Sequence, residues 1–281
     1  MKKYFHALVF LGIVFALFFY VGKKWRPSRV QEGEARAFSA SIYPMINHSF
    51  VILIVGYNNG AWVEKTLESA CRQNYSNFRI VYIDDGSEDG SFELVKDLAQ
   101  ENSLVTLVHN EKKLGVLANY LQAISSFEPD DIVVVLKGED WLAHEWVLSR
   151  LNQYYANPDL WITYGQSRLY PTYTMGNAKE FDRTLKVRSQ PFSAGPLHSF
   201  YANLFQQIAE EDLGFFAGAE LAYMLPMLEM ADGHAVFVPE IFYIENQLGS
   251  KEDGELEARC VKAIRKLSAY APLMKRRLEE M

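Results

Sequence analysis

Acidic and amide side chains follow four apolar runs in this 281-residue chain, and their types are those that could do chemistry. Carboxylates can hold a divalent cation or take a proton, and a cation held in this way neutralises a diphosphate. Asp85-Gly86 also suits a tight turn, and Asp89 or Ser91 a helix N-cap, roles that are compatible with binding. The residues that follow the four runs are Gly56-Tyr57-Asn58-Asn59-Gly60, Asp84-Asp85-Gly86-Ser87, His109-Asn110 and Lys137-Gly138-Glu139-Asp140.

The apolar runs themselves predict the elements that position these side chains. The runs are short and rich in β-branched residues, as in buried strands, and helical periodicity separates them. The resulting β-α-β-α-β-α-β order predicts an α/β fold with a mostly parallel central sheet and helices on both faces. Ligands of such sheets bind beyond the carboxyl ends of the strands, so the polar residues should meet at one edge. The predicted strands are 50–57, 78–83, 104–108 and 132–136.

Several functional classes are excluded by what the sequence lacks. It contains neither a G-x-G-x-x-G turn after the first strand nor a G-x-x-x-x-G-K-[ST] loop, which argues against a dehydrogenase or an ATPase. The formal net charge is -7, so no basic footprint for nucleic acid is present at the level of the whole chain. Cys71 and Cys260 lack metal-ligand spacing and are interpreted as buried thiols.

The N-terminal segment is interpreted as a membrane anchor. Residues 4–21 are apolar except for His6, and lysines and arginines flank both ends. No small-x-small cleavage site follows directly, which favours an uncleaved single-pass anchor over residues 1–24 rather than a signal peptide. The flanking charges give slight weight to a cytoplasmic catalytic domain. Residues 25–48 are predicted to be a linker.

Beyond Asp140 the pattern is looser. We expect helices over 144–155, 197–209 and 219–230, strands over 161–164 and 235–243, and a loop over 171–196. A final helix is expected over 255–281 with a break at Pro272. The predicted domain therefore spans residues 49–250, with a C-terminal helical extension over 251–281.

Four motifs, in order and spacing, resemble the catalytic core of glycosyltransferase family 2, which has the GT-A fold. They are the first strand with its turn (50–58), the aspartate-rich turn Asp84-Asp85-Gly86-Ser87, the segment Leu114-Gly115-Val116-Leu117-Ala118-Asn119 with Asn110, and Leu136-Lys137-Gly138-Glu139-Asp140-Trp141-Leu142 at the D-x-D position. A looser likeness to one bacterial subgroup continues through residues 219–246. Most of the chain beyond the linker is covered.

The resemblance implies transfer of a sugar from a nucleotide-diphosphate sugar, a UDP-sugar being favoured, to an acceptor hydroxyl with inversion. It implies that Asp85 contacts the base, that Asn58 and Asp84 shape the pocket, and that Glu139 or Asp140 serves a Mn²⁺ or Mg²⁺ ion and the diphosphate. Glu220 is the first candidate for the catalytic base, with Asp212 and Glu211 behind it. The acceptor is a glycan, a lipid or a protein. The implied lining of the nucleotide-sugar pocket is Tyr57, Asn58, Asp84, Asp85, Ser87, Gly115, Asn119, Lys137 and Gly138.

Two departures from the family pattern leave alternatives open. Lys137 and Glu139 stand where the family usually has aspartates, and Glu220 stands where the subgroup has one. A protonated lysine cannot ligate a cation, but it can lie against a diphosphate as a point charge. Three readings follow: a metal site built from Glu139 and Asp140, a metal-independent enzyme that uses Lys137, or a catalytically silent sugar-nucleotide-binding or scaffold protein of the same fold.

Overall fold

The computed structural model describes residues 46–213, 220–249 and 254–275. These residues belong to a compact unit that begins at Pro44. The predicted anchor at 1–24 and nearly all of the predicted linker lie outside the described residues. Within those residues, no helix has the length and apolar character needed to cross a membrane.

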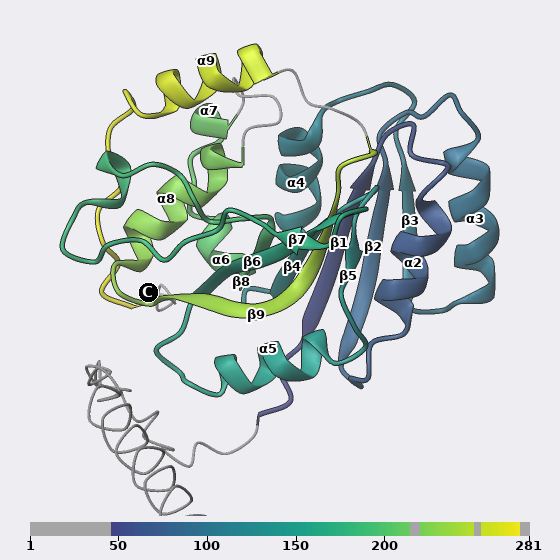
Figure 1. Ribbon diagram of the computed structural model, residues 1–281, viewed down its shortest axis with the longest axis horizontal. Helices are drawn as coiled ribbons and strands as arrows, with labels where there is room; N and C mark the ends of the chain where they lie inside the picture. The colour runs from purple at the N-terminus through teal and green to yellow at the C-terminus, as the bar shows by residue number, and fades with distance from the viewer. Residues whose placement is uncertain (1–45, 214–219, 250–253, 276–281) are drawn as a thin grey trace, which may run out of the picture. The chain divides into compact units, whose positions relative to one another are not determined.

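One nine-stranded sheet forms the centre of this unit (Figure 1). The order of the strands is β3-β2-β1-β4-β8-β6-β9-β5, and β7 pairs with β6 outside this path. The strands are β1 (Phe50–Gly56), β2 (Phe78–Asp84), β3 (Val105–His109), β4 (Ile132–Lys137), β5 (Trp141–Leu142), β6 (Ile162–Tyr170), β7 (Thr174–Met175), β8 (Leu197–Tyr201) and β9 (Ala235–Asn246).

Helices cover both faces of the sheet, as predicted. Every residue of β1 is buried, and alternate residues of this strand belong to two separate hydrophobic clusters. Residues of α2 (Val63–Cys71), α3 (Ser91–Glu101) and α5 (Val147–Tyr155) belong to one cluster. The other contains residues of α4 (Val116–Ile124), α6 (Ala202–Phe205), α7 (Glu210–Leu213), α8 (Leu221–Ala231) and α9 (Gly254–Ile264). Burial on two faces explains the continuous apolar run at residues 50–55.

The sheet is mixed: the expected parallel pairing holds throughout β3, β2, β1 and β4, and the other strands combine parallel and antiparallel pairs. β3, β2, β1 and β4 are parallel neighbours. β8 then runs antiparallel to both β4 and β6, and β5 runs antiparallel to β9, while β6 and β9 are parallel. The register places Gly56 beside Asp84 and Asp84 beside His109, with Lys137 opposite Val55. The carboxyl ends of these strands therefore meet at one edge, as predicted.

The predicted helices over 197–209 and 255–281 are each wrong over part of their length. Residues 197–201 form strand β8, and only the short helix α6 follows within the range predicted to be helical. Pairing with both β4 and β6 buries all five residues of β8, and this tertiary context decides the conformation. The C-terminal helix α9 ends at Ile264, and residues 265–275 continue without helix. The 3₁₀ helix η1 (Val187–Ser189) and β7 interrupt the predicted loop over 171–196.

Candidate active site at the strand-end rim

Asp85 holds together one wall of the predicted pocket. Its Oδ1 accepts hydrogen bonds from the side-chain amide of Asn110 (2.9 Å) and the backbone N–H of Leu114 (2.8 Å). Its Oδ2 accepts one from the backbone N–H of Gly115 (2.8 Å). Asn110 also donates to Asn119 Oδ1 (2.7 Å), and Asn119 donates to the Gly115 carbonyl (2.9 Å). Asp85, Gly115 and Asn119 thus come together as predicted, and Asp85 fixes the loop that leads into α4.

Asp84 is fully buried beside this wall. Its Oδ2 lies 2.9 Å from His109 Nδ1 and accepts a hydrogen bond from the backbone N–H of Ser87 (3.1 Å). Its Oδ1 has no hydrogen-bond partner among the described residues. His109, on the edge strand β3, packs against the Phe92 ring, with 4.0 Å between ring centroids and 32° between the ring planes. Asp84 and His109 are also register partners on the neighbouring strands β2 and β3.

The turns that follow β1 and β2 are bonded to each other. Asn58 has a positive φ of 51° and donates its backbone N–H to Ser87 Oγ (2.9 Å). The Asn58 side chain accepts the backbone N–H of Glu88 (2.8 Å). Asparagine tolerates this left-handed conformation better than most residues. Lys113 Nζ lies 3.7 Å from the centroid of the Tyr57 ring, a cation–π contact between the segment that follows β3 and the turn that follows β1.

The segment Lys137–Asp140 is held against the end of β1 by its backbone. The Gly138 carbonyl accepts a hydrogen bond from Asn59 Nδ2. Thr66 Oγ1 lies 2.9 Å from the Gly138 carbonyl and 2.8 Å from the Asp140 carbonyl, so its one proton is shared between them. A Cβ at position 138 would lie 2.6 Å from Asn59 Nδ2 and 2.7 Å from Gly56 Cα. Glycine is therefore required for this close approach of the two chains.

Asp140 is 2% exposed and supports the segment from within. Its Oδ2 accepts a hydrogen bond from Tyr243 OH (2.7 Å), and its Oδ1 accepts the backbone N–H of Asn246 (2.7 Å). Burial raises the pKa of this carboxyl to about 7, and the two hydrogen bonds oppose that shift. Both oxygens are thus already bonded to groups of β9.

Glu139 is placed to receive a cation more readily than Asp140. Its backbone carbonyl accepts the Asn246 side-chain amide (3.1 Å), and its side chain is partly exposed. Nowhere in the described residues do three His, Cys, Asp or Glu side chains gather closely enough to hold a metal. Mg²⁺ at phosphate sites is often held by one or two carboxylates together with substrate oxygens and water. Glu139 fits that smaller ligand set.

Lys137 and Glu220 meet at the end of β4. Lys137 Nζ lies 3.1 Å from Glu220 Oε1, and the two side chains are 33% and 26% exposed. Burial alone would raise the pKa of Glu220, but Lys137 and then His198 outweigh it, and the pKa is lowered. His198 is fully buried, and its Nδ1 lies 2.7 Å from Tyr223 OH. Its Nε2 has no hydrogen-bond partner among the described residues.

Asp212, the second candidate base, lies on α7 and is engaged elsewhere. Its carboxylate accepts a hydrogen bond from Tyr270 OH (2.6 Å), which belongs to the segment that follows α9. Burial, and after it the hydrogen bond to Asp212, raises the pKa of Tyr270 to about 12. The structure therefore brings Glu220, rather than Asp212, to Lys137.

Several residues that contact the predicted site residues were not themselves among the residues predicted to line the pocket. Asn59 and Thr66 hold the Gly138 carbonyl, and Tyr243 bridges the Lys137 backbone N–H (3.1 Å) and Asp140. His198 lies on a strand that the sequence predicted to be helix. Asn59 directly follows the predicted Asn58 and carried a local signal, whereas His198 and Tyr243 reach the site through long-range pairing.

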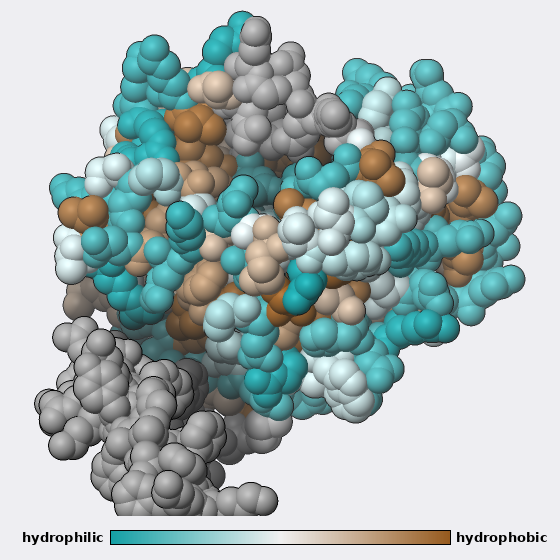
Figure 2. Space-filling model, in the orientation of Figure 1, coloured by the Kyte–Doolittle hydropathy of each residue, from teal (hydrophilic) through white to brown (hydrophobic). Residues whose placement is uncertain are grey.

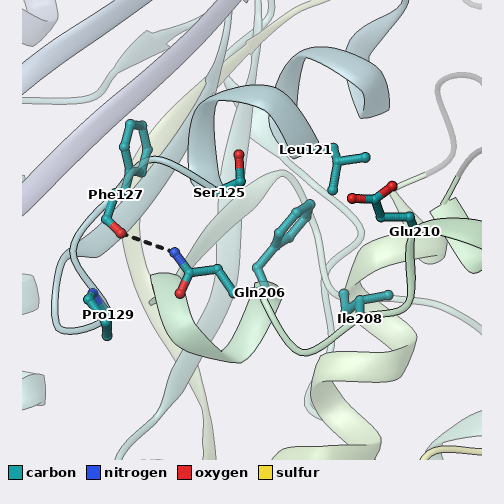
Figure 3. Close-up of a pocket in the computed structure, with 8 residues that line it drawn as sticks. Leu121, Ser125, Phe127, Pro129, Gln206, Ile208 and Glu210 are labelled. Carbon is teal, nitrogen blue, oxygen red and sulfur yellow. Dashed lines mark hydrogen bonds between the residues drawn. The ribbon is translucent and has the colours of Figure 1, made fainter.

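A pocket of about 430 Å³ lies away from these residues (Figure 3). Its lining comes from α4 and the loop that follows it and from the segment around α6 and α7, and Gln206 donates to the Phe127 carbonyl (3.0 Å) between these two parts. None of the predicted site residues lines it. The residues that line this pocket are Leu121, Ser125, Phe127, Pro129, Phe205, Gln206, Ile208 and Glu210.

The face of the molecule shown in Figure 2 carries small hydrophobic patches separated by hydrophilic residues.

The chain is similar to glycosyltransferases both in its sequence and in its structure. Residues 51–211 match the family model described as Glycosyl transferase family 2. Glycosyltransferase GlyG of Streptococcus pneumoniae is 26% identical over 179 residues, which cover 64% of this chain and 55% of GlyG. The putative glycosyltransferase EpsH of Bacillus subtilis is 24% identical over 96 residues, 34% of this chain and 27% of EpsH. The chain thus spans about half the length of GlyG.

Two solved structures share the fold. TarS 1–349 of S. aureus, in complex with UDP-GlcNAc, superposes with a TM-score of 0.59 at 14% identity, over 77% of this chain and 65% of that one. The mannosyltransferase PcManGT of Pyrobaculum calidifontis, in complex with GDP-Man and Mn²⁺, gives a TM-score of 0.59 at 21% identity, over 80% and 66%. At these identities the likeness establishes the α/β GT-A-like fold with its mixed sheet.

Proposed function

Because the chain belongs to glycosyl transferase family 2, we propose that it transfers a sugar from a nucleotide-diphosphate sugar to an acceptor hydroxyl with inversion at the anomeric carbon. The observation that carries this proposal is the strand-end rim, by which we mean residues 57–59, 84–87, 110–119 and 137–140. Hydrogen bonds join these four segments directly, and they lie at the carboxyl ends of β1, β2 and β4 and at the start of α4.

The nucleoside occupies the part of the rim around Tyr57, Asp84 and Asp85 in this proposal. Asp85 builds the wall through Asn110 and Gly115 rather than standing apart from it. Asp84 is fully buried beside the same wall, and its carboxylate supports the turn by accepting a hydrogen bond from the Ser87 N–H. UDP-sugars are the favoured donors, and GDP-sugars are the second class to test, since the two fold neighbours bind one of each.

The diphosphate lies against Lys137 and the backbone of Gly138, with Glu220 as the base. Glu220 takes the proton of the acceptor hydroxyl, and the acceptor oxygen attacks the anomeric carbon from the face opposite the leaving group. The bond from that carbon to the diphosphate oxygen breaks, and its electron pair leaves on the diphosphate. Lys137 stabilises this negative charge as it develops. A single displacement of this kind inverts the anomeric centre.

A Mn²⁺ or Mg²⁺ ion, if used, would be held by Glu139 together with diphosphate oxygens. Such an ion supplies further positive charge to the leaving group. Asp140 supports the segment through Tyr243 and Asn246, with both of its oxygens already bonded to these residues. Lys137 supplies a positive charge at the same segment without metal, so either arrangement fits the residues present.

Residues 1–24 are proposed to anchor the enzyme in a membrane as a single pass, with the catalytic domain in the cytoplasm, where sugar nucleotides occur. This proposal rests on the apolar run over 4–21 and its basic flanks. The acceptor, whether glycan, lipid or protein, is not specified by the rim residues.

The test is turnover by the full-length chain with a panel of UDP- and GDP-sugars, in Mn²⁺, in Mg²⁺ and in EDTA. Turnover that EDTA abolishes shows that an ion is required, with Glu139 or Asp140 as its expected ligand, and turnover that survives EDTA favours charge neutralisation by Lys137. An Asp85→Asn variant, which removes acceptor capacity from the wall at nearly constant shape, should lose nucleotide affinity by about tenfold or more. Absence of nucleotide binding in the wild-type chain would refute the proposal.

One observation favours a second candidate function. An ion pair between Lys137 and Glu220 stands where family members have two acids, and such neutralisation suits a protein that binds a sugar nucleotide without turnover. In that case nucleotide binds tightly and depends on Asp85, but no donor is consumed with any acceptor class. The turnover panel separates the two candidates.

A further inference from the structure

In the proposed function, two anionic groups compete for the Lys137 ammonium group at the end of β4: the Glu220 carboxylate and the donor diphosphate. Lys137 lies at the D-x-D position, where the proposed function places the diphosphate, and its Nζ lies 3.1 Å from Glu220 Oε1. The backbone of Lys137 is fixed by pairing with β1 and by the hydrogen bond from its N–H to Tyr243 OH (3.1 Å). Its side chain is one-third exposed and can turn toward solvent. The ammonium group can therefore change partners while the strand stays in place.

We propose that the donor diphosphate competes with Glu220 for Lys137, so that binding of the donor releases the Glu220 carboxylate to take the acceptor's proton. This inference rests on the proposed function and adds an order to it. The proton of the acceptor hydroxyl passes to Glu220, the acceptor oxygen bonds to the anomeric carbon, and the diphosphate leaves with the electron pair while it holds Lys137.

The electrostatics of the pair support this exchange. A nucleoside diphosphate carries more negative charge than one carboxylate, so it is the stronger partner for an ammonium group. Lys137 is the larger of two influences that keep the pKa of Glu220 low, the other being His198, and both oppose burial. Withdrawal of Lys137 leaves Glu220 with burial and with His198, whose own pKa is lowered by burial. The pKa of the carboxylate then rises, which makes it a better base.

The groups that face Glu220 come from three strands. Lys137 belongs to β4 and His198 to β8, and Tyr243 of β9 is close enough for the Glu220 charge to raise the pKa of its phenol further. His198 Nε2 is buried and has no hydrogen-bond partner among the described residues. In the proposed exchange His198, whose charge influences Glu220, would act as a positioning residue for that carboxylate.

The exchange makes an unusual prediction, because loss of the base should improve donor binding. A Glu220→Gln variant removes the competing charge, so its affinity for UDP should rise about 2- to 5-fold over wild type, as expected for a partly exposed ion pair. Its turnover should fall by about 10²- to 10⁴-fold, the usual cost of losing a general base. Uridine carries no phosphate, and its affinity should be the same in both proteins.

The measurement is calorimetric titration of full-length wild type, E220Q, K137M and the double variant with UDP and with uridine. GDP and guanosine replace them if the turnover panel selects a GDP-sugar. In the K137M background the E220Q substitution should no longer change UDP affinity, which isolates the pairwise effect. Glu240→Gln is the matched control, because Glu240 is also a partly exposed glutamate in an ion pair, with Arg150 (2.9 Å) on α5, and should leave UDP affinity unchanged.

The outcomes separate the inference from the function beneath it. If wild type binds UDP and E220Q binds it equally or more weakly, the exchange is wrong and the proposed function stands. If E220Q keeps wild-type turnover, Glu220 is not the base, and the release step has no catalytic meaning. If neither UDP nor GDP binds the wild-type chain, the proposed function fails and the exchange fails with it.

Discussion

The absence of a side chain at Gly138 allows the proposed diphosphate-binding segment (137–140) to lie close to the end of β1. A Gly138→Ala substitution would place a Cβ 2.7 Å from Gly56 Cα, so the segment must move away from β1. We expect the free energy of unfolding to fall by about 1–3 kcal/mol. We also expect turnover to fall by more than the same measurement shows for the control variant. Gly60→Ala is the control, since its Cβ would meet a movable side-chain oxygen of Asp89 at 3.2 Å. Equal losses in the two variants, by urea unfolding and turnover, would count against this role.

The Glu220 carboxylate makes the second prediction at the residue scale. A base must be deprotonated, so activity is lost as pH falls through its pKa. The pKa is low while Lys137 is paired with Glu220 and rises when the diphosphate holds Lys137. The acid limb of kcat should therefore lie at higher pH than that of kcat/KM for the donor, which reports the unliganded enzyme.

The same profiles in other variants assign that limb. Asp140, whose pKa burial raises to about 7, would give a limb that persists in the residual activity of E220Q. The limb of Glu220 should be absent from that variant. Acid limbs of kcat and kcat/KM that coincide in wild type would contradict the exchange at Lys137.

At the scale of elements, Asp131 links the starts of the three central strands. It is 3% exposed, and its carboxylate accepts hydrogen bonds from Ser49 Oγ (2.6 Å) before β1, from Arg79 Nη2 (2.6 Å) in β2 and from the Glu128 N–H (3.1 Å). Burial raises the pKa of Asp131, but the bonds from Arg79 and Ser49 outweigh it and lower the pKa overall. Its contribution to stability is thus present above the ordinary aspartate pKa and is lost as pH falls through the lower folded value.

An Asp131→Asn variant should accordingly lose about 1–3 kcal/mol of unfolding free energy at pH 7. The difference from wild type should shrink as the pH falls below about 4, where the unfolded aspartate is protonated. Urea unfolding at a series of pH values measures it. A difference that is constant from pH 7 down to pH 3 would show that the charge of Asp131 does not contribute.

The elements of the first half were predictable because each carries its own periodicity. β1, β2, β3 and β4 lie where the apolar runs are, and α2, α3 and α4 lie between them. β8 was not predictable in this way, because its five residues are buried by pairing with β4 and β6 on either side. Residues 265–275 also departed from the expected helix, and their conformation depends on contacts with distant residues.

The residues of the candidate site fall into the same two groups, those with a local sequence signal and those placed by long-range packing. Asp84, Asp85, Lys137 and Glu139 follow strands that could be recognised locally, so the sequence placed them at one rim. The pairing of Lys137 with Glu220, and the presence of His198 beside them, depends on how α8 and β8 pack against β4, which has no local signal.

At the scale of the whole molecule, Arg188 connects helix α8 with the end of α9 and the start of the C-terminal segment, residues 265–275. It pairs with Glu229 of α8 (2.6 Å), with side chains 16% and 8% exposed, and donates to the carbonyls of Ile264 (2.8 Å) and Leu267 (3.1 Å). Leu273 then bonds to the Met230 carbonyl (2.9 Å). The C-terminal segment is thus part of the same core as α8, the helix that begins beside Glu220.

An Arg188→Met variant should lose about 3 kcal/mol of stability, because it leaves Glu229 buried without its cation. Protease cleavage within 265–275 should become faster than in wild type, as followed by mass spectrometry. Arg183→Met is the control, since Arg183 pairs with Glu180 on the surface, with both side chains more than half exposed, and should be nearly neutral. Unchanged proteolysis in the Arg188 variant would show that other contacts hold the segment.

The location of nucleotide binding tests the central claim most directly. Hydrogen–deuterium exchange of the full-length chain should be measured with and without saturating UDP, and with GDP if UDP does not bind. We expect slower exchange at the strand-end rim, in peptides that contain 57–59, 84–87, 110–119 and 137–140. Protection confined to peptides around 121–129 and 205–210, which line the pocket beside α4 and α6, would contradict it.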